Sequence, residues 1–260
     1  MNKDTVRQIV IVVAVVVTIV VNILANALPF NGIDTGVISD SFEVFFVPAG
    51  YVFSIWGLIY LGLIAFAVFQ ALPSQRENPR LRKIGSIFVA SSVANVLWLV
   101  FWHYFWNTAL FPLTLVDMLI ILGTLIAIYL RLGTGRTEVP LGERLAVRLP
   151  FSIYLGWITV ATIANVTYLL YHWGWQPAAV TAQILAVAVL GAAVVIAALM
   201  SYFRGDVAYL AVFVWAFVGI ALNPLPRFDG ATIVKTGGWV AAALVAVLAI
   251  AGLVLRRRRV

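Results

Sequence analysis

Eight long apolar runs dominate the chain and restrict what it can fold into. They cover roughly residues 6–28, 49–72, 84–103, 109–130, 149–171, 178–200, 207–223 and 236–255, and the seventh is the shortest. A helix needs about 20 apolar residues to cross a bilayer. Apolar and polar residues do not alternate along the runs, which also exceed the roughly 9–11 residues of a membrane-barrel strand. The pattern predicts an all-α polytopic membrane helix bundle with about eight transmembrane helices.

The composition agrees with a chain whose outer surface is solvated by lipid. Of the 260 residues, 63% are hydrophobic and 10% are charged, whereas about a quarter of the residues of a soluble domain are charged. There is no cysteine, which excludes disulfides, a thiolate nucleophile and cysteine metal ligands. Because the chain has only two histidines, His103 and His172, we expect no metal site.

The basic residues follow the predicted topology. With the N-terminus inside, the inner segments hold 15 of the 17 Lys and Arg, and the outer segments keep Arg227 and Lys235. This is the pattern of the positive-inside rule, so the net charge of +7 indicates membrane orientation, and no nucleic-acid partner is expected. We expect a protein of the bacterial inner (plasma) membrane with both termini cytoplasmic. The basic tail at 256–259 would contact anionic lipid.

The first apolar run admits a second interpretation. Lys3 and Arg7 precede it and Ala-Asn-Ala follows at 25–27, an order that resembles a signal peptide. The run is longer than the usual 7–15 residues of such a segment. We therefore expect it to remain as a helix.

The loop at 29–47 is predicted to lie outside the membrane. It is acidic, contains no basic residue, and ends in the apolar residues Phe42, Phe45, Phe46 and Val47. A loop of this length in a compact bundle is either disordered or functional. The Phe cluster favours a lid that folds back onto the bundle, and the alternative is a chain at the lipid surface.

Aromatic and amide side chains recur at helical spacing on three runs. The stripes are Phe53, Trp56 and Tyr60 on the second run, Asn95, Trp98 and Trp102 on the third, and Trp157, Ala161 and Asn165 on the fifth. Residues three or four apart share a helix face, and an amide that faces hydrocarbon is costly, so we expect the stripes to face one another. They would line a pocket for a flat or elongated apolar ligand, or they would be ordinary packing in which each Asn bonds a neighbouring helix.

Four motifs, in order on four successive runs, resemble one known family. They are PAGYVF with WGLIY at 48–60, ANVLW at 94–98, LTLVDMLIILGTLIA at 113–127 and YLGWITVATIAN at 154–165. Together they are similar to the TspO/MBR family, the tryptophan-rich sensory proteins related to the mitochondrial translocator protein. The resemblance covers about residues 1–173.

The resemblance implies a five-helix transmembrane bundle at 1–173, with a ligand cavity beneath the first loop. The matching residues that would line or border this cavity are Trp56, Tyr60, Trp98, Trp157, Ala161 and Asn165. It also implies a porphyrin, sterol-like or other hydrophobic pigment as ligand, and a homodimer. Residues 174–260 would then add three transmembrane helices with a basic C-terminal tail.

The chain departs from the family pattern at several points. Tyr51 stands in place of a Trp and Ala49 in place of a Pro, which weakens the implication of a tetrapyrrole ligand. In the additional region, Asn223 follows Trp215 by eight residues, as Asn165 follows Trp157. This echo is either coincidence or the sign of a second aromatic and amide wall.

Asp117 is the only carboxylate inside a predicted span. An ionisable group in a membrane is a functional candidate, although the family resemblance favours a structural acid. We favour an integral membrane protein that binds a hydrophobic ligand in an outward-facing Trp-lined pocket and acts as sensor, carrier or regulator. The alternatives are a proton-coupled secondary transporter that uses Asp117 and a pigment-degrading membrane enzyme. The spans contain no acid/base pair and no activated nucleophile, which favours a binding protein over the enzyme.

Overall fold

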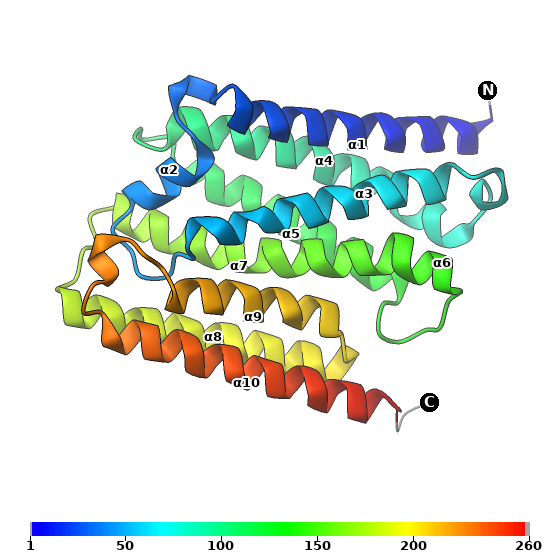
Figure 1. Ribbon diagram of the computed structural model, residues 1–260. Helices are drawn as coiled ribbons and strands as arrows, with labels where there is room; N and C mark the ends of the chain where they lie inside the picture. Colours follow the sequence, from blue (N-terminus) through cyan, green and yellow to red (C-terminus); the bar gives the residue numbers. More distant parts are fainter. Residues whose placement is uncertain (1, 258–260) are drawn as a thin grey trace.

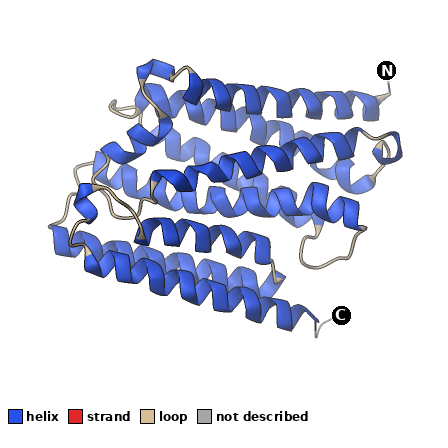
Figure 2. Ribbon diagram, viewed as in Figure 1, coloured by secondary structure: helices blue, strands red, loops and turns tan. Residues whose placement is uncertain are grey.

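The chain folds into long apolar helices that run alongside one another (Figure 1). The structure, a computed structural model, describes residues 2–257, with side chains up to residue 254. The side chains of the basic tail at 256–259 lie outside the described residues. Within the described part, every regular element is helical (Figure 2). The predicted all-α membrane bundle is confirmed.

Seven helices are long and apolar enough to cross a membrane. They are α1 (Lys3–Ala27), α3 (Ile55–Ala71) with the preceding turn η2 (Gly50–Ser54), α4 (Pro79–Phe105), α5 (Pro112–Leu132), α7 (Leu149–His172), α8 (Ala179–Arg204) and α10 (Thr232–Arg257). The shorter elements are η1 (Phe30–Gly32), α2 (Thr35–Ser41), η3 (Pro73–Gln75), α6 (Leu141–Glu143), the π-helical turn η4 (Arg144–Arg148) and η5 (Pro226–Phe228).

The seventh predicted run forms α9 (Val207–Ala221), which has 15 residues. At 1.5 Å per residue it is roughly 22 Å long, which is shorter than a hydrocarbon core of about 30 Å. Asp206 determines where it begins, because its carboxylate accepts a hydrogen bond from the backbone N–H of Tyr209 at 3.2 Å. All eight predicted helices are therefore present, seven of them at spanning length.

The helices pack in two connected groups. α1, α3, α4, α5 and α7 contact one another as one group, and α8 packs mainly against α10. α9 joins the groups, because it packs against α7 on one side and against α10 on the other. Its approach to α7 depends on Gly156, where an added Cβ would lie 3.0 Å from the Tyr209 carbonyl oxygen. The division at residue 173 stays a prediction.

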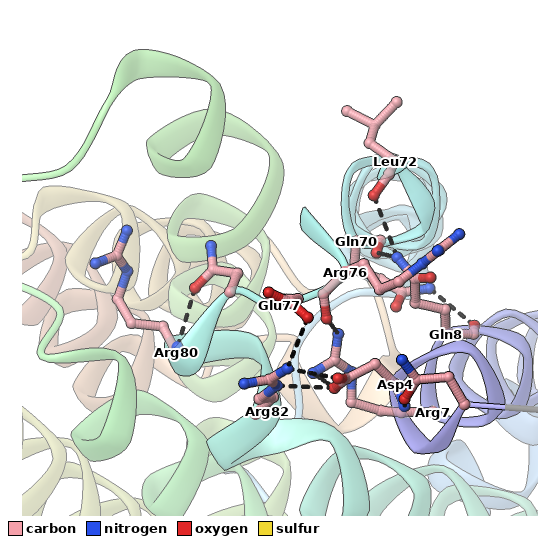
Figure 3. Close-up of polar contacts among 11 residues, drawn as sticks. Asp4, Arg7, Gln8, Gln70, Leu72, Arg76, Glu77, Arg80 and Arg82 are labelled. Atoms are coloured by element: carbon pink, nitrogen blue, oxygen red, sulfur yellow. Dashed lines mark hydrogen bonds and ion pairs between the residues drawn. The ribbon is translucent and has the colours of Figure 1, made fainter. Parts of the chain in front are cut away.

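Polar contacts tie α1 to α3 and α4 at the end of the bundle that carries both chain termini (Figures 1 and 3). Gln8 Nε2 donates to the Gln70 carbonyl at 2.6 Å, and Gln70 Nε2 donates to the Gln8 carbonyl at 3.0 Å. Arg82 Nε donates to Asp4 Oδ1 at 2.8 Å. This end also carries most of the basic residues, as the predicted topology requires.

The loop between α1 and α3, residues 28–49, forms a lid at the opposite end of the bundle (Figure 1). Its apolar cluster is buried, with exposed fractions of 4% for Phe42, 9% for Phe45, 1% for Phe46 and 0% for Val47. The loop therefore folds back onto the helices as predicted, and the alternative of a chain lying at the lipid surface is wrong. The short helix α2 within the lid was not predicted, because Gly, Asp and Ser in this stretch are typical of turns.

Candidate functional site

A cavity of about 660 Å³ lies between the helices beneath the lid. α1, α3, α4, α5 and α7 each contribute to its walls, and Thr35 and Gly36 of the lid border it as well. Its size is that of pockets that hold drug-sized ligands, which are about 300–1,000 Å³. The described residues that line it are uncharged, so an ion bound deep inside would have no opposite charge to compensate for its lost hydration.

Most of the predicted site residues line this one cavity. They are Phe53, Trp56, Tyr60, Asn95, Trp98, Trp157 and Ala161. Each comes from the helix face that the spacing indicated, because positions three or four apart lie on one side of a helix. The structure therefore brings the three predicted stripes together.

Aromatic rings in contact with one another build the walls. The Trp56 ring stacks on Tyr60, with centroids 5.7 Å apart, and meets Trp157 edge to face at 6.5 Å. Phe53 also contacts Trp157 edge to face, at 5.7 Å. Trp157 is 3% exposed, so its indole points away from lipid. Aromatic pairs prefer such stacked and edge-to-face arrangements, and the flat apolar surfaces of these rings suit a flat ligand.

Asn95 serves both packing and the cavity. Its Nδ2 donates to the Tyr154 hydroxyl at 3.0 Å, and its Oδ1 accepts from Asn22 Nδ2 at 2.7 Å. The amide thus joins α4 to α7 and to α1, as interhelical amides in membranes do. Since Asn95 also lines the cavity, the two interpretations left open by the sequence both apply to this residue.

Trp102 and Asn165 lie beside the main cavity rather than in its wall. They line a smaller pocket of about 50 Å³, which shares Phe53, Trp98 and Trp157 with the main cavity. Asn165 is 1% exposed, and its Oδ1 accepts from Thr114 at 3.3 Å. Trp102 stacks on Trp98, with ring centroids 5.0 Å apart. These two residues support the wall from behind in this structure.

Three polar residues of the cavity wall were missed from the sequence. Asn22 and Asn26 lie on α1, and Thr35 lies on the lid. The signal for the two amides was present, because two Asn four residues apart in an apolar run share a helix face. For Thr35 there was no such signal, since its position depends on how the lid folds. With Asn95, these residues give an apolar cavity a few uncharged polar groups.

Asp117 does not line the cavity. It is 4% exposed on α5, while its neighbour Met118 and Ile121 face the cavity. Its Oδ2 atom is buried and has no hydrogen-bond partner among the described residues. In the part of the chain with described side chains, no three His, Asp or Glu residues gather as a metal site would require.

Comparison with family models gave a match over most of the chain. A family model described as "TSPO-like protein" matches residues 8–253. The match extends past residue 173, where the sequence motifs end, and covers α8, α9 and most of α10. Comparisons with curated proteins and with solved structures gave no match.

Proposed function

Because the chain belongs to the family of TSPO-like proteins, we propose that it binds a hydrophobic ligand in the Trp-lined cavity. The observation that carries the proposal is the convergence of Trp56, Trp98 and Trp157, from three different helices, on one volume of about 660 Å³. Ordinary helix packing leaves few voids larger than a water molecule. A space of this size, walled by aromatic rings in a membrane bundle, suits a bound molecule.

The walls indicate the chemistry of that molecule. Stacked and edge-to-face rings favour a flat or elongated apolar body such as a tetrapyrrole, a sterol-like molecule or another pigment. The uncharged amide groups of Asn22 and Asn26 suit a neutral polar group on the ligand. Any carboxylate on the ligand would stay near the mouth of the cavity. A protein that holds such a molecule acts as its sensor, carrier or regulator.

The charge distribution supports an orientation for this membrane protein. The end that carries both termini also carries most of the Lys and Arg residues, so by the positive-inside rule it faces the cytoplasm. The lid then faces outward from the plasma membrane, which in our proposal is the bacterial inner membrane.

Quenching of tryptophan fluorescence tests the binding proposal. Titration of the purified protein with protoporphyrin IX should give saturable quenching. Trp157→Leu should abolish binding, and Trp98→Leu should raise the dissociation constant at least roughly tenfold, because each substitution removes a wall of the cavity. Trp239→Leu is the matched control, since Trp239 is 49% exposed on α10, away from the cavity. Equal quenching in all four proteins would show that the porphyrin does not bind in the cavity.

Asp117 supports proton-coupled transport as a second candidate function. A buried carboxyl oxygen without a partner is costly unless it carries a proton, and a group that takes up and releases a proton can couple transport to a gradient. Uptake of porphyrin into vesicles that depends on a proton gradient, and that is lost in Asp117→Asn, would establish this function. Uptake that is unchanged in Asp117→Asn would exclude it.

A further inference from the structure

The lid is attached to α4 and α7 over its first half. Asn31 Nδ2 donates to the His103 carbonyl at 3.1 Å, and Trp102 Nε1 donates to the Thr35 carbonyl at 3.2 Å. Further on, the hydroxyls of Ser39 and Tyr168 lie 2.8 Å apart. These contacts fix α2 on two sides of the cavity.

The second half of the lid, with the turn η2 that follows it, is attached to α9 and to Asn223 just beyond its end. The Ala49 backbone N–H donates to the Gly219 carbonyl at 3.0 Å, Trp215 Nε1 donates to the Val52 carbonyl at 3.0 Å, and Asn223 Nδ2 donates to the Val47 carbonyl at 2.9 Å. These three hydrogen bonds form what we call the α9 clamp. The two residues of the sequence echo, Trp215 and Asn223, are thus both part of the clamp.

The connection between α9 and α10 adds to the clamp. Arg227 Nη1 donates to the Asp40 carbonyl at 3.0 Å, and the Phe228 ring meets Phe45 edge to face at 5.3 Å. Phe228 is 0% exposed. Opening the lid by a hinge would therefore break these hydrogen bonds and expose buried apolar rings at the same time.

The remaining side of the cavity lies between the lid ends of α1 and α3. Ile23, Asn26, Ala27 and Gly50 line the cavity and are also exposed on the outside of the bundle, so they mark its mouth. Ile23 is 52% exposed. At the opposite end the two helices are joined through Gln8 and Gln70. Figure 1 shows that α1 and α3 diverge from there toward the lid.

We infer that the ligand enters and leaves sideways, through this mouth between α1 and α3, because the α9 clamp holds the lid shut. This inference rests on the proposed binding function. The mouth lies in the side of the bundle and, in the proposed orientation, faces the outer half of the membrane. The cavity therefore takes up molecules that are already dissolved in lipid. The helices after α7 then act on ligand exchange without contacting the ligand.

Exchange rates measured on the full-length protein in vesicles test the inference. Protoporphyrin IX is supplied from separate vesicles, and tryptophan quenching follows its association and dissociation. Narrowing the mouth with Ile23→Phe and Ala27→Phe together should slow both rates roughly tenfold, and measuring the two rates separately distinguishes a change of access from a change of affinity. Val180→Phe with Ile184→Phe is the matched control, because both residues are exposed near the lid end of α8, 60% and 54% respectively.

Loosening the α9 clamp should speed the association and dissociation of the porphyrin. An added Cβ at Gly219 would collide with Val52 Cγ2, so Gly219→Ala pushes η2 away from α9 and should speed both rates about fivefold by opening a second route. Gly191→Ala is the control, since an added Cβ there meets nothing within 4 Å. If Gly219→Ala does not fold, Trp215→Phe removes one bond of the clamp and keeps a ring.

The outcomes separate this inference from the proposed function. Absence of saturable quenching in the unaltered protein would overturn the binding proposal itself. Normal binding with unchanged rates in the mouth variant would overturn the lateral route, and the lid would then be the entrance. Unchanged rates in both clamp variants would show that α9 does not control exchange.

Discussion

At the scale of single residues, Asn95 shows how a buried amide serves two purposes in a membrane. Its donor and acceptor are both used, by Tyr154 and Asn22, and the same side chain lines the cavity. Lipid offers no replacement partner for either group. The residue therefore determines how closely α1, α4 and α7 approach, and through them the width of the cavity.

Asn95→Ala should lower the free energy of unfolding by about 2 kcal/mol, because it removes two interhelical bonds and leaves Tyr154 and Asn22 without those partners. Thermal unfolding in detergent measures the loss. Asn107→Ala, in the exposed turn after α4, should be close to neutral. Equal stability of the two variants would contradict the role we assign to Asn95.

The Asp40 carboxyl in the lid makes the stability of the folded protein depend on pH. Burial raises its pKa above the ordinary value of 3.8, and the charge of Arg227 opposes the shift only in part. The folded lid thus binds a proton more readily than the unfolded chain does, so this contribution to stability is present at low pH and is lost as pH rises through the raised pKa. Tyr168 and Arg227 face the same carboxyl, and neither changes its charge between pH 4 and 7 by its ordinary pKa.

Comparison with Asp40→Asn isolates this effect, because the other carboxylates are common to both proteins. Between pH 7 and pH 4 the unfolding temperature of the unaltered protein should rise relative to that of the variant. A difference that stays constant across this range would show that the Asp40 carboxyl is not buried by the lid.

At the scale of elements, the start of α9 depends on Asp206. Its Oδ1 caps the helix through the Tyr209 N–H, and its Oδ2 accepts from the Tyr129 hydroxyl at 2.8 Å and from Ser152 Oγ at 2.6 Å. One carboxylate thereby joins α5, α7 and α9. This role could not be predicted, because Asp206 stands at the edge of an apolar run and resembles a loop residue.

Asp206→Ala should destabilise the protein by about 3 kcal/mol, since it removes a helix cap worth about 1 kcal/mol and leaves two buried hydroxyls without their acceptor. Asp206→Asn keeps an oxygen that can cap the helix and should lose less. Asp229→Ala, at an exposed position, is the control. Thermal unfolding of the three variants should rank them in this order, and a loss in Asp229→Ala as large as in Asp206→Ala would refute the assignment.

The helices and the aromatic walls could be predicted because their signals are local. Each apolar run is continuous, and Trp98 and Trp157 lie on stripes that are visible within one helix. The clamp could not be predicted in this way, since Trp215 and Val52 are 163 residues apart and Asn223 and Val47 are 176 apart. Their bonds also go to backbone carbonyls, which every residue carries, so no pattern of side chains marks the partners.

At the scale of the whole molecule, the two groups of helices depend on each other. α9 covers one face of α7, where Gly156 and the Thr159 hydroxyl meet Tyr209, and the apolar stretch of the segment Leu141–His172, which contains α7, is 67% buried. A helix on the outside of a bundle would face lipid along much of its length. The family match across residues 8–253 includes the helices on both sides of residue 173.

Separate expression of the two parts tests that dependence. The connection between α7 and α8 is exposed, with Trp173 at 64% and Trp175 at 51%, so a break between residues 175 and 176 removes few contacts. Fragments 1–175 and 176–260, expressed together, should assemble and co-purify, because the surface of α7 at Gly156 is complementary to α9. Gly156→Leu in the first fragment should prevent assembly, since a side chain at this position collides with Tyr209 and Val212. Gly57→Leu is the control and should leave assembly intact, because an added Cβ at Gly57 meets nothing within 4 Å. If fragment 1–175 alone unfolds at the same temperature as the full chain and quenches with the same exchange rates, the helices after α7 are an independent unit and neither stabilise the bundle nor hold its lid.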